Sequence, residues 1–377
     1  MAKGAYIGVD NVARKIKKGY IGVDGVAHKI KKAYIGIGGV ARPCWSGGEL
    51  AYYGQITGLS VGRYDLAATS VGNYALFGGG TDGAAVNTVD AYDTSLTRAS
   101  ATNMSVSRQG LAATSVGNYA LFAGGYGTGT YKTTTNAYDT SLTRTNPTAL
   151  GQSRRYLAAT TVGNYALFGG GDAGTGKLKT YVDIYDTSLT RTNPTPLHTA
   201  RRYLAATTVG NYALFGGGTN GYSNAYYTTV DAYDTSLTRT TATDLSVGRY
   251  ELAATTVGNY ALFGGGCYSA TRKATVDAYD TSLTRTTPTA LSVGRQMLTA
   301  TNIGDYALFG GGYYDGSTSN NCGTVDAYDT SLTRTTATDL SVPRTSLAAT
   351  SVGNYALFGG GSGPNGYSAI VDAYTIA

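Results

Sequence analysis

One tetrapeptide, Tyr-Ala-Leu-Phe, recurs seven times in this 377-residue sequence and constrains its fold more than any other feature. The copies begin at Tyr74, Tyr119, Tyr165, Tyr212, Tyr260, Tyr306 and Tyr355. They lie about 47 residues apart, a period that suits a unit of four β-strands. Units of this kind close into a ring, so the sequence predicts an all-β, seven-bladed β-propeller over residues 46–377.

One repeat, residues 252–295, indicates how the strands run. Small and β-branched residues at 252–257 predict an inner strand, and the apolar residues 260–263 predict a second strand buried on both faces. Residues 276–279 predict a third strand and residues 284–289 an outer fourth one. Pro288 is tolerated there because one edge of an outermost strand makes no ladder bonds. No stretch has helical periodicity, so almost no helix is expected.

The ends of the repeat array predict how the ring closes. The last copy ends with residues 371–377 and lacks an outer strand, whereas residues 51–60 align with the missing piece. An open ring would leave unpaired strand edges. An N-terminal strand is therefore expected to complete the last blade.

Several short phrases recur through the array with small changes, and in one copy they are Arg249, Ala253-Ala254, Leu262-Phe263-Gly264-Gly265 and Tyr279-Asp280. This pattern resembles the kelch repeat, in which the two loops that differ between copies open onto one face of the disc. Two departures are visible. The Trp that usually follows Tyr-Asp is absent, and Leu283 and its counterparts are expected to fill its space. The second copy reads Phe122-Ala123-Gly124-Gly125, which displaces the glycine doublet by one residue.

Residues 1–45 form a second, shorter repeat with a period of about 14 residues. Asp10-Asn11, Asp24-Gly25 and Gly38-Gly39 separate short apolar runs, which predicts three β-hairpins. This segment carries nine basic and two acidic side chains, whereas the rest of the chain has a net charge of −1. Its Lys-rich ends are interpreted as solvated strand edges, and nucleic acid is not an expected partner of the chain.

The hairpin repeats resemble modules at the start of tail- and baseplate-associated proteins of Firmicutes phages and prophages. The resemblance implies an attachment or oligomerisation segment that contacts other tail or virion proteins, and homo-oligomerisation stays open. The start of the sequence shows no signal peptide, so synthesis in the host cytoplasm is expected, with the virion as final location and the cytoplasm as the alternative. No apolar run approaches the ~20 residues of a membrane helix, so no membrane insertion is expected.

The sequence offers few groups for catalysis. It has two histidines, His28 and His198, and three cysteines without metal-ligand spacing. Cys267 and Cys322 are expected to be free thiols. The Asp of Asp-Ala-Tyr-Asp and the Arg before each inner strand recur in nearly every copy, which indicates structural roles. We therefore expect a protein without enzymatic activity, cofactor or metal.

Two places differ from copy to copy: the loop after the glycines and the pair after the recurrent Arg. Their Tyr, Arg and Asn residues are typical of recognition surfaces, whereas unselected drift, the alternative, would favour smaller polar residues. The candidate ligand-binding residues are Tyr64, Tyr126, Tyr131, Tyr156, Tyr203, Tyr222, Tyr226, Tyr227, Tyr250, Tyr268, Arg272, Tyr313, Tyr314, Asn320 and Tyr367.

These observations give the hypothesis of a receptor-binding or adhesin protein of a phage or prophage tail. Its variable loops would bind a host surface glycan or protein. Two alternatives remain open: an intracellular kelch scaffold for protein–protein interaction, and a structural virion component without a receptor.

Overall fold

The computed structural model describes residues 48–376 except 175, 222–224 and 316–319, and it also describes the backbone of six strands between residues 6 and 46. Two compact units are present, one of Met1–Ala51 with Ile376–Ala377 and one of Tyr52–Thr375. The described residues form no helix, so none is long and apolar enough to cross a bilayer.

The six N-terminal strands form three antiparallel hairpins, as the 14-residue repeat predicts. Each hairpin consists of two consecutive strands: β1 (Tyr6–Val9) with β2 (Val12–Lys15), β3 (Gly19–Val23) with β4 (Val26–Ile30), and β5 (Lys32–Ile37) with β6 (Val40–Ser46). The side chains of these strands lie outside the described part of the chain.

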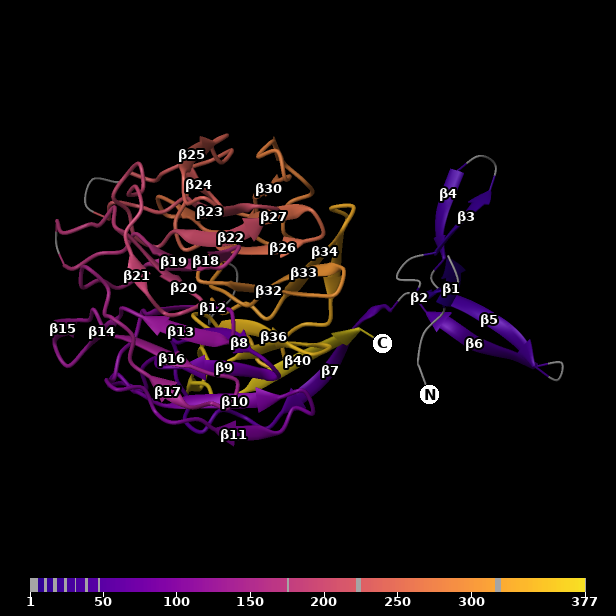
Figure 1. Cartoon of the computed structure of the whole chain (residues 1–377), viewed down its shortest axis with the longest axis horizontal. Helices are drawn as coiled ribbons and strands as arrows, with labels where there is room; N and C mark the ends of the chain where they lie inside the picture. Colours follow the sequence, from indigo (N-terminus) through magenta and orange to yellow (C-terminus); the bar gives the residue numbers. More distant parts are fainter. Residues whose placement is uncertain are drawn as a thin grey trace. The chain divides into compact units, whose positions relative to one another are not determined.

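Seven four-stranded antiparallel sheets form the blades of the propeller (Figure 1). The inner strands are β8 (Ala67–Val71), β12 (Ala112–Val116), β18 (Ala158–Val162), β22 (Ala205–Val209), β26 (Ala253–Val257), β32 (Thr299–Ile303) and β36 (Ala348–Val352). The second strands are β9 (Tyr74–Gly78), β13 (Tyr119–Ala123), β19 (Tyr165–Gly169), β23 (Tyr212–Gly216), β27 (Tyr260–Gly264), β33 (Tyr306–Gly310) and β37 (Tyr355–Gly359). The third strands are β10 (Val89–Asp93), β16 (Thr135–Tyr138), β20 (Val182–Asp186), β24 (Val230–Asp234), β30 (Val276–Tyr279), β34 (Val325–Asp329) and β40 (Val371–Ile376).

The outer strands show how the ring closes. They are β11 (Arg98–Ser100), β17 (Arg144–Thr145), β21 (Arg191–Thr192), β25 (Arg239–Ala242), β31 (Arg285–Thr286), β35 (Arg334–Ala337) and, in blade 7, β7 (Leu50–Ile56). β7 pairs with β40, so blade 7 combines both ends of the repeat array, as predicted. The Tyr52 hydroxyl donates to Asp372 Oδ1 at 2.7 Å and adds a side-chain contact to this closure.

The outer strand of blade 5 is shorter than the sequence predicted. β31 spans two residues, whereas six were expected over 284–289. Blades 4 and 6 carry Ala242 and Ala337 where blade 5 carries Pro288, and there the outer strand extends to the alanine. Proline has no N–H for the ladder, so it ends the pairing early.

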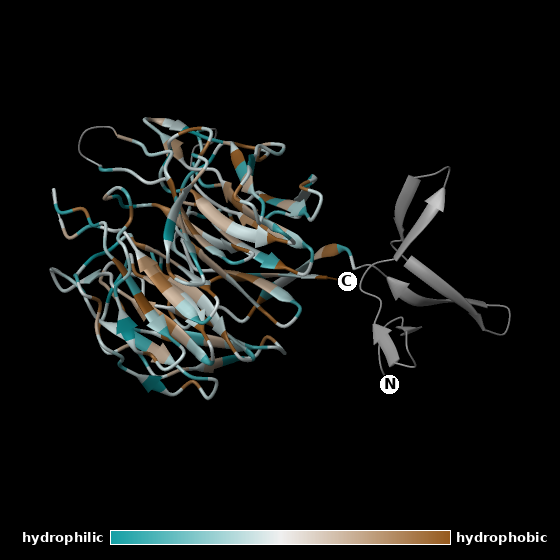
Figure 2. Cartoon of the chain, turned by 45° about the horizontal axis from the view of Figure 1, so that its top comes forward, coloured by the Kyte–Doolittle hydropathy of each residue, from teal (hydrophilic) through white to brown (hydrophobic). Residues whose placement is uncertain are grey.

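Hydrophobic contacts between neighbouring blades form the core. In the interface between blades 3 and 4, Leu167 of blade 3 belongs to the same cluster as Phe215 and Tyr233 of blade 4, and all three side chains are fully buried. Because consecutive residues of Tyr-Ala-Leu-Phe point to opposite faces of a strand, both faces of the second strand are buried, as predicted. Hydrophobic stretches follow the strands in Figure 2. Leu283, expected to replace the kelch Trp, packs against the cluster of the preceding interface.

The glycines after the second strand allow the blades to approach closely. At Gly169 a Cβ would lie 2.8 Å from the Phe215 ring, and at Gly170, with φ +71°, it would lie 2.7 Å from the Arg201 carbonyl. Gly124 and Gly125 have φ values of 70° and 104°, like the second and third glycines of the other blades. The expected displacement in copy 2 is therefore wrong: Ala123 replaces the first glycine, and the doublet stays in place.

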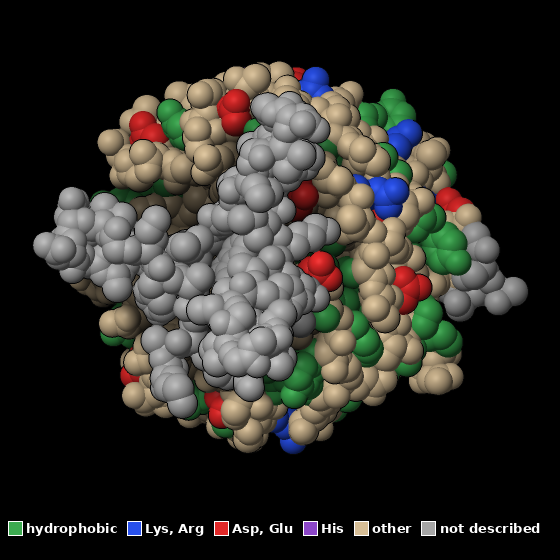
Figure 3. Space-filling model, turned by 90° about the vertical axis from the view of Figure 1, so that its right-hand side faces the viewer, with side chains coloured by type: hydrophobic (Ala, Val, Ile, Leu, Met, Phe, Trp, Pro, Cys, Tyr) green, Lys and Arg blue, Asp and Glu red, His purple; other side chains and the backbone are tan. Residues whose placement is uncertain are grey.

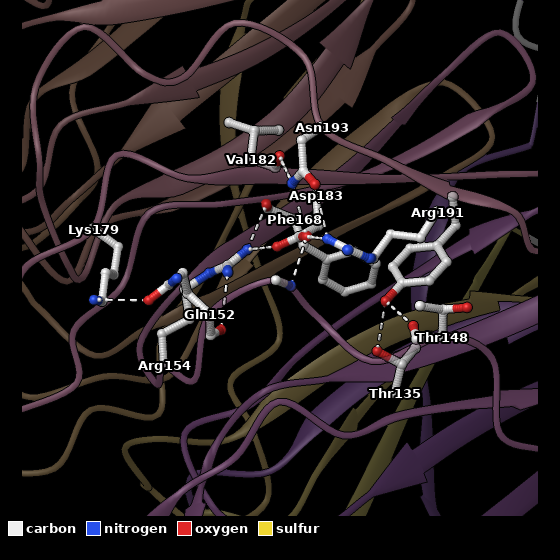
Figure 4. Close-up of polar contacts among 12 residues, drawn as sticks. Thr135, Thr148, Gln152, Arg154, Phe168, Lys179, Val182, Asp183, Arg191 and Asn193 are labelled. Atoms are coloured by element: carbon white, nitrogen blue, oxygen red, sulfur yellow. Dashed lines mark hydrogen bonds and ion pairs between the residues drawn. The ribbon is translucent and has the colours of Figure 1, made fainter.

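The recurrent Arg and Asp are structural, as predicted, and they form a buried ion pair in six of the seven blades. In blade 3, Arg154 is fully buried and donates to the Phe168 carbonyl at 3.0 Å and to Asp183 at 2.6 Å (Figure 4). Arg191 reaches the same carboxylate at 2.6 Å from the outer strand. Six blades repeat the inner pair at 2.6–2.9 Å.

Blade 2 departs from this pattern because Asn136 replaces the Asp. Arg108 donates to Asn136 Oδ1 at 2.7 Å, and the Asn136 amide donates to Asn146 Oδ1 at 2.6 Å. With no carboxylate beside it, burial lowers the pKa of Arg108 to about 10. In blade 3, Asn193, the counterpart of Asn146, donates its amide to Asp183 instead.

The substitution Asn136→Asp is expected to stabilise the protein. It pairs a guanidinium that is already buried, and a rotated Asn146 amide can donate to the new carboxylate, so the free energy of unfolding should rise by about 1 kcal/mol. Urea unfolding at neutral pH measures this change. A lower midpoint would show that the Asn136–Asn146 bond matters more than the missing charge.

Candidate functional site

A closed ring of backbone hydrogen bonds joins the seven blades at one face, here called the loop face. In each blade, the second residue after the buried Arg has a φ between 52° and 61°. Its N–H donates to the carbonyl of its counterpart in the preceding blade at 2.8–3.1 Å. These residues, here called the mouth ring, are Asp65, Gly110, Tyr156, Tyr203, Glu251, Met297 and Ser346. Six of the seven are not glycine, so a regular backbone holds unlike side chains in a conformation that they rarely adopt.

The mouth ring surrounds a pocket of about 540 Å³, here called the mouth pocket. The Leu that follows each ring residue also lines it, and its remaining lining residues are Tyr64, Thr345, Ser362 and Tyr367. The Tyr64 and Tyr367 rings stack with their centroids 5.2 Å apart. The volume and the mixture of apolar walls with a few polar groups are typical of a small-molecule site.

Two carboxyl groups face the mouth pocket. Burial raises the pKa of Asp65 to about 6, against an opposing effect of Arg155. Burial also raises the pKa of Glu251 to about 7, and the charge of Asp65 adds to this rise. Both carboxyls therefore change their charge close to neutral pH, because the pocket solvates them poorly.

Seven tyrosines from blades 2 to 5 form two series of ring contacts on the loop face, one of Tyr131 with Tyr126 and one from Tyr156 to Tyr268, and together they are here called the tyrosine arc. In order they are Tyr131, Tyr126, Tyr156, Tyr203, Tyr250, Tyr226 and Tyr268. The centroids of Tyr156 and Tyr203 lie 4.2 Å apart, and those of Tyr226 and Tyr250 lie 5.5 Å apart with an interplanar angle of 15°. Adjacent blades therefore present neighbouring aromatic surfaces.

A guanidinium joins the two parts of the arc. Arg155 Cζ lies 5.1 Å from the Tyr126 centroid and 4.6 Å from that of Tyr156. Arg202 Cζ lies 5.2 Å from the Tyr203 ring. Both arginines pair with Asp172, which is fully buried. The rings are therefore held by a charged support and do not depend on stacking alone.

A smaller group lies on blades 5 and 6. Arg272 Cζ is 4.8 Å from the Tyr313 ring centroid, and its guanidinium pairs with Asp315 at 3.0 Å. The Asn320 amide donates to the Tyr313 hydroxyl at 2.9 Å.

The predicted binding residues thus fall into three groups: the tyrosine arc, the Tyr64–Tyr367 pair, and Arg272 with Tyr313 and Asn320. Among the described rings, Tyr227 and Tyr314 join none of these groups, and Tyr222 lies outside the described residues. Sequence reasoning missed Asp65, Glu251, Arg155 and Arg202. All four belong to the variable pairs after the recurrent Arg, so variation between copies could have identified them. In each of these pairs only the tyrosine was predicted to bind a ligand.

The inner strands also line a second, smaller space of about 270 Å³. Its walls carry hydroxyls, and Thr114 and Thr160 contact hydroxyls of the next blade at 2.9 Å. On the side of the propeller seen in Figure 3, the described side chains are mostly uncharged, with a few Asp, Glu, Lys and Arg.

Cys267 and Cys322 are free, as expected, and both are buried. Among the described side chains, no group of three or more His, Cys, Asp or Glu could hold a metal ion. Comparison with protein-family models gives no match, and comparison with curated proteins gives none either.

Proposed function

We propose that the chain is a non-enzymatic binding protein of a phage or prophage tail, whose loop face binds a glycan or protein on the host cell surface. The tyrosine arc is the observation that carries this proposal. It brings seven rings together, in two series joined by Arg155, on a framework that is nearly the same in every blade. Tyr supplies broad contact area at low cost in conformational entropy, and its ring suits the apolar face of a sugar.

The framework itself supports a binding role. The repeated Asp and Arg are tied in buried ion pairs, so they serve the scaffold, and the side chains that differ between blades lie at the loop face. A regular scaffold with variable tips is the usual arrangement of recognition proteins. The kelch-like repeat pattern agrees with this role.

The proposed setting rests on residues 1–45. Their hairpin repeats resemble attachment modules of Firmicutes phage tails, and the basic charge of the chain is concentrated there. In this proposal, the hairpin segment joins the propeller to other tail proteins and the loop face remains for the host.

Replacing Tyr126 and Tyr226 with alanine tests the proposal. Both rings belong to the arc and neither lines the mouth pocket, so the double variant should bind Gram-positive host cells at least about tenfold more weakly, as expected for the loss of two stacking rings. Fluorescent full-length protein on a panel of cells, with purified wall polysaccharide as competitor, measures the binding.

Tyr181→Ala is the matched control because this ring is 43% exposed and lies outside the arc. Its binding should equal that of the unmodified protein. Equal binding by the double variant, or no binding to any cell by the unmodified protein, would exclude the arc as a receptor site and favour a scaffold or structural role.

A further inference from the structure

The mouth pocket is lined by acidic side chains and by no basic ones. Its lining holds the carboxyls of Asp65 and Glu251 but no Lys, Arg or His. Four tyrosines, Tyr64, Tyr156, Tyr203 and Tyr367, supply the remaining large polar side chains of the lining. Burial raises the pKa of Tyr203, and that of Tyr156 also, so these phenols stay neutral at physiological pH. The pocket therefore presents acidic groups among aromatic rings and leucines.

One carboxylate oxygen in this pocket lacks a partner. Glu251 Oε2 is buried and has no hydrogen-bond partner within the described part of the chain. A buried polar atom without a partner is costly, and such groups in native proteins usually have a functional reason. An incoming donor would satisfy this oxygen.

The arginines whose charges act on the two carboxyls are engaged elsewhere. Arg155 and Arg202 pair with the buried Asp172, and Arg272 pairs with Asp315. They act on Asp65 and Glu251 only through space. The acidic charge of the pocket is therefore not neutralised by a contact of its own.

We propose that the mouth pocket binds the protonated amine of an amino sugar. The carboxyls of Asp65 and Glu251 accept hydrogen bonds from the amine, and the tyrosines pack on the sugar ring. This inference rests on the proposed function, because it names one chemical group of the glycan that the loop face binds. A sugar fits better than a lysine side chain, because a lysine is narrow for a pocket of about 540 Å³ flanked by two pairs of stacked rings.

The pocket's chemistry gives the binding a distinct pH dependence. A bound cation favours the charged form of both carboxyls, so affinity should fall as the pH is lowered through about 7 and 6, the pKa values of Glu251 and Asp65. The other groups that act on these carboxyls are the guanidiniums of Arg155, Arg202 and Arg272, which stay charged throughout this range.

Two trisaccharides with the same sugar backbone provide the test: the glucosamine trimer, which carries amines, and its N-acetylated form, in which neutral acetamides replace the amines. Calorimetry on the full-length protein at neutral pH should show the glucosamine trimer binding at least about tenfold more tightly, as expected for a charge-assisted hydrogen bond. The double variant Asp65→Asn and Glu251→Gln should lose this preference. Asn accepts a positive φ well, so the mouth ring should persist.

Asp82→Asn serves as the control because Asp82 is an exposed carboxylate outside the pocket, and it should keep the preference. Equal binding of the two trimers, no binding of either, or a preference that survives in the double variant would overturn the inference. Tighter binding of an Nα-acetylated lysine amide than of the glucosamine trimer would also overturn it, in favour of a peptide ligand. If the trimers fail to support the amine site but the protein still binds cells through Tyr126 and Tyr226, the proposed receptor role is retained, because the cell-binding assay tests the tyrosine arc and not the mouth pocket.

Discussion

A protein that lacks residues 1–57 is expected to lose its cooperative fold, whereas one that lacks residues 1–47 should keep it. The longer deletion removes β7 and leaves β40 as an unpaired edge. It also removes the Tyr52–Asp372 hydrogen bond and the contact between the Tyr52 and Tyr374 rings, whose centroids lie 5.2 Å apart. An open ring with an exposed edge strand aggregates readily. Thermal unfolding followed by circular dichroism, together with size-exclusion chromatography, compares the two proteins.

A peptide of residues 46–58 gives a second readout. Added to the longer deletion during refolding, it should pair with β40 and restore a cooperative transition, because an extended peptide can complete a sheet at a free edge. If the longer deletion stays monomeric and melts like the shorter one, β7 does not close the ring in a way that matters for stability.

Much of the fold could be predicted because the repeats themselves carry the information. The seven copies predicted the number of blades. The last copy lacks an outer strand and residues 51–60 match the missing piece, which predicted the closure through β7. The outer strand of blade 5 was predicted too long because Pro288 was accepted within it. Comparing Pro288 with Ala242 could have corrected it, since only the alanine has an N–H for the ladder.

The candidate site was predictable only in part. Variation between copies identified the two loops, but it could not show that the Tyr126 and Tyr156 rings both contact the Arg155 guanidinium, because the contact with Tyr126 joins two blades. The mouth ring could not be predicted from the sequence. Asp65 and Glu251 hold a positive φ that sequence patterns assign to Gly or Asn, and the bonds that hold it there come from neighbouring blades.

The buried ion pairs should be the most sensitive framework positions, and Asp183→Ala is expected to lower the free energy of unfolding by about 3–5 kcal/mol. Asp183 accepts hydrogen bonds from Arg154, Arg191, Asn193 and the Gly151 N–H. Its loss leaves the Arg154 guanidinium buried without a counter-charge. Asp183→Asn should cost about half as much, because blade 2 already stably holds an Arg beside an Asn, and an amide oxygen still accepts a hydrogen bond.

The pH dependence of stability separates this ion pair from a simple packing effect. Burial alone would raise the pKa of Asp183, but Arg154, the Gly151 N–H and Asn193 together hold it below its ordinary value. A carboxyl whose pKa is lower in the folded state stabilises the fold above its unfolded pKa, and this contribution is lost as the pH falls through the folded value. Urea unfolding from neutral to acidic pH should therefore show a smaller acid-induced loss of stability for Asp183→Ala than for the unmodified protein. Parallel curves with a constant offset would mean that Asp183 acts through packing and not through its charge.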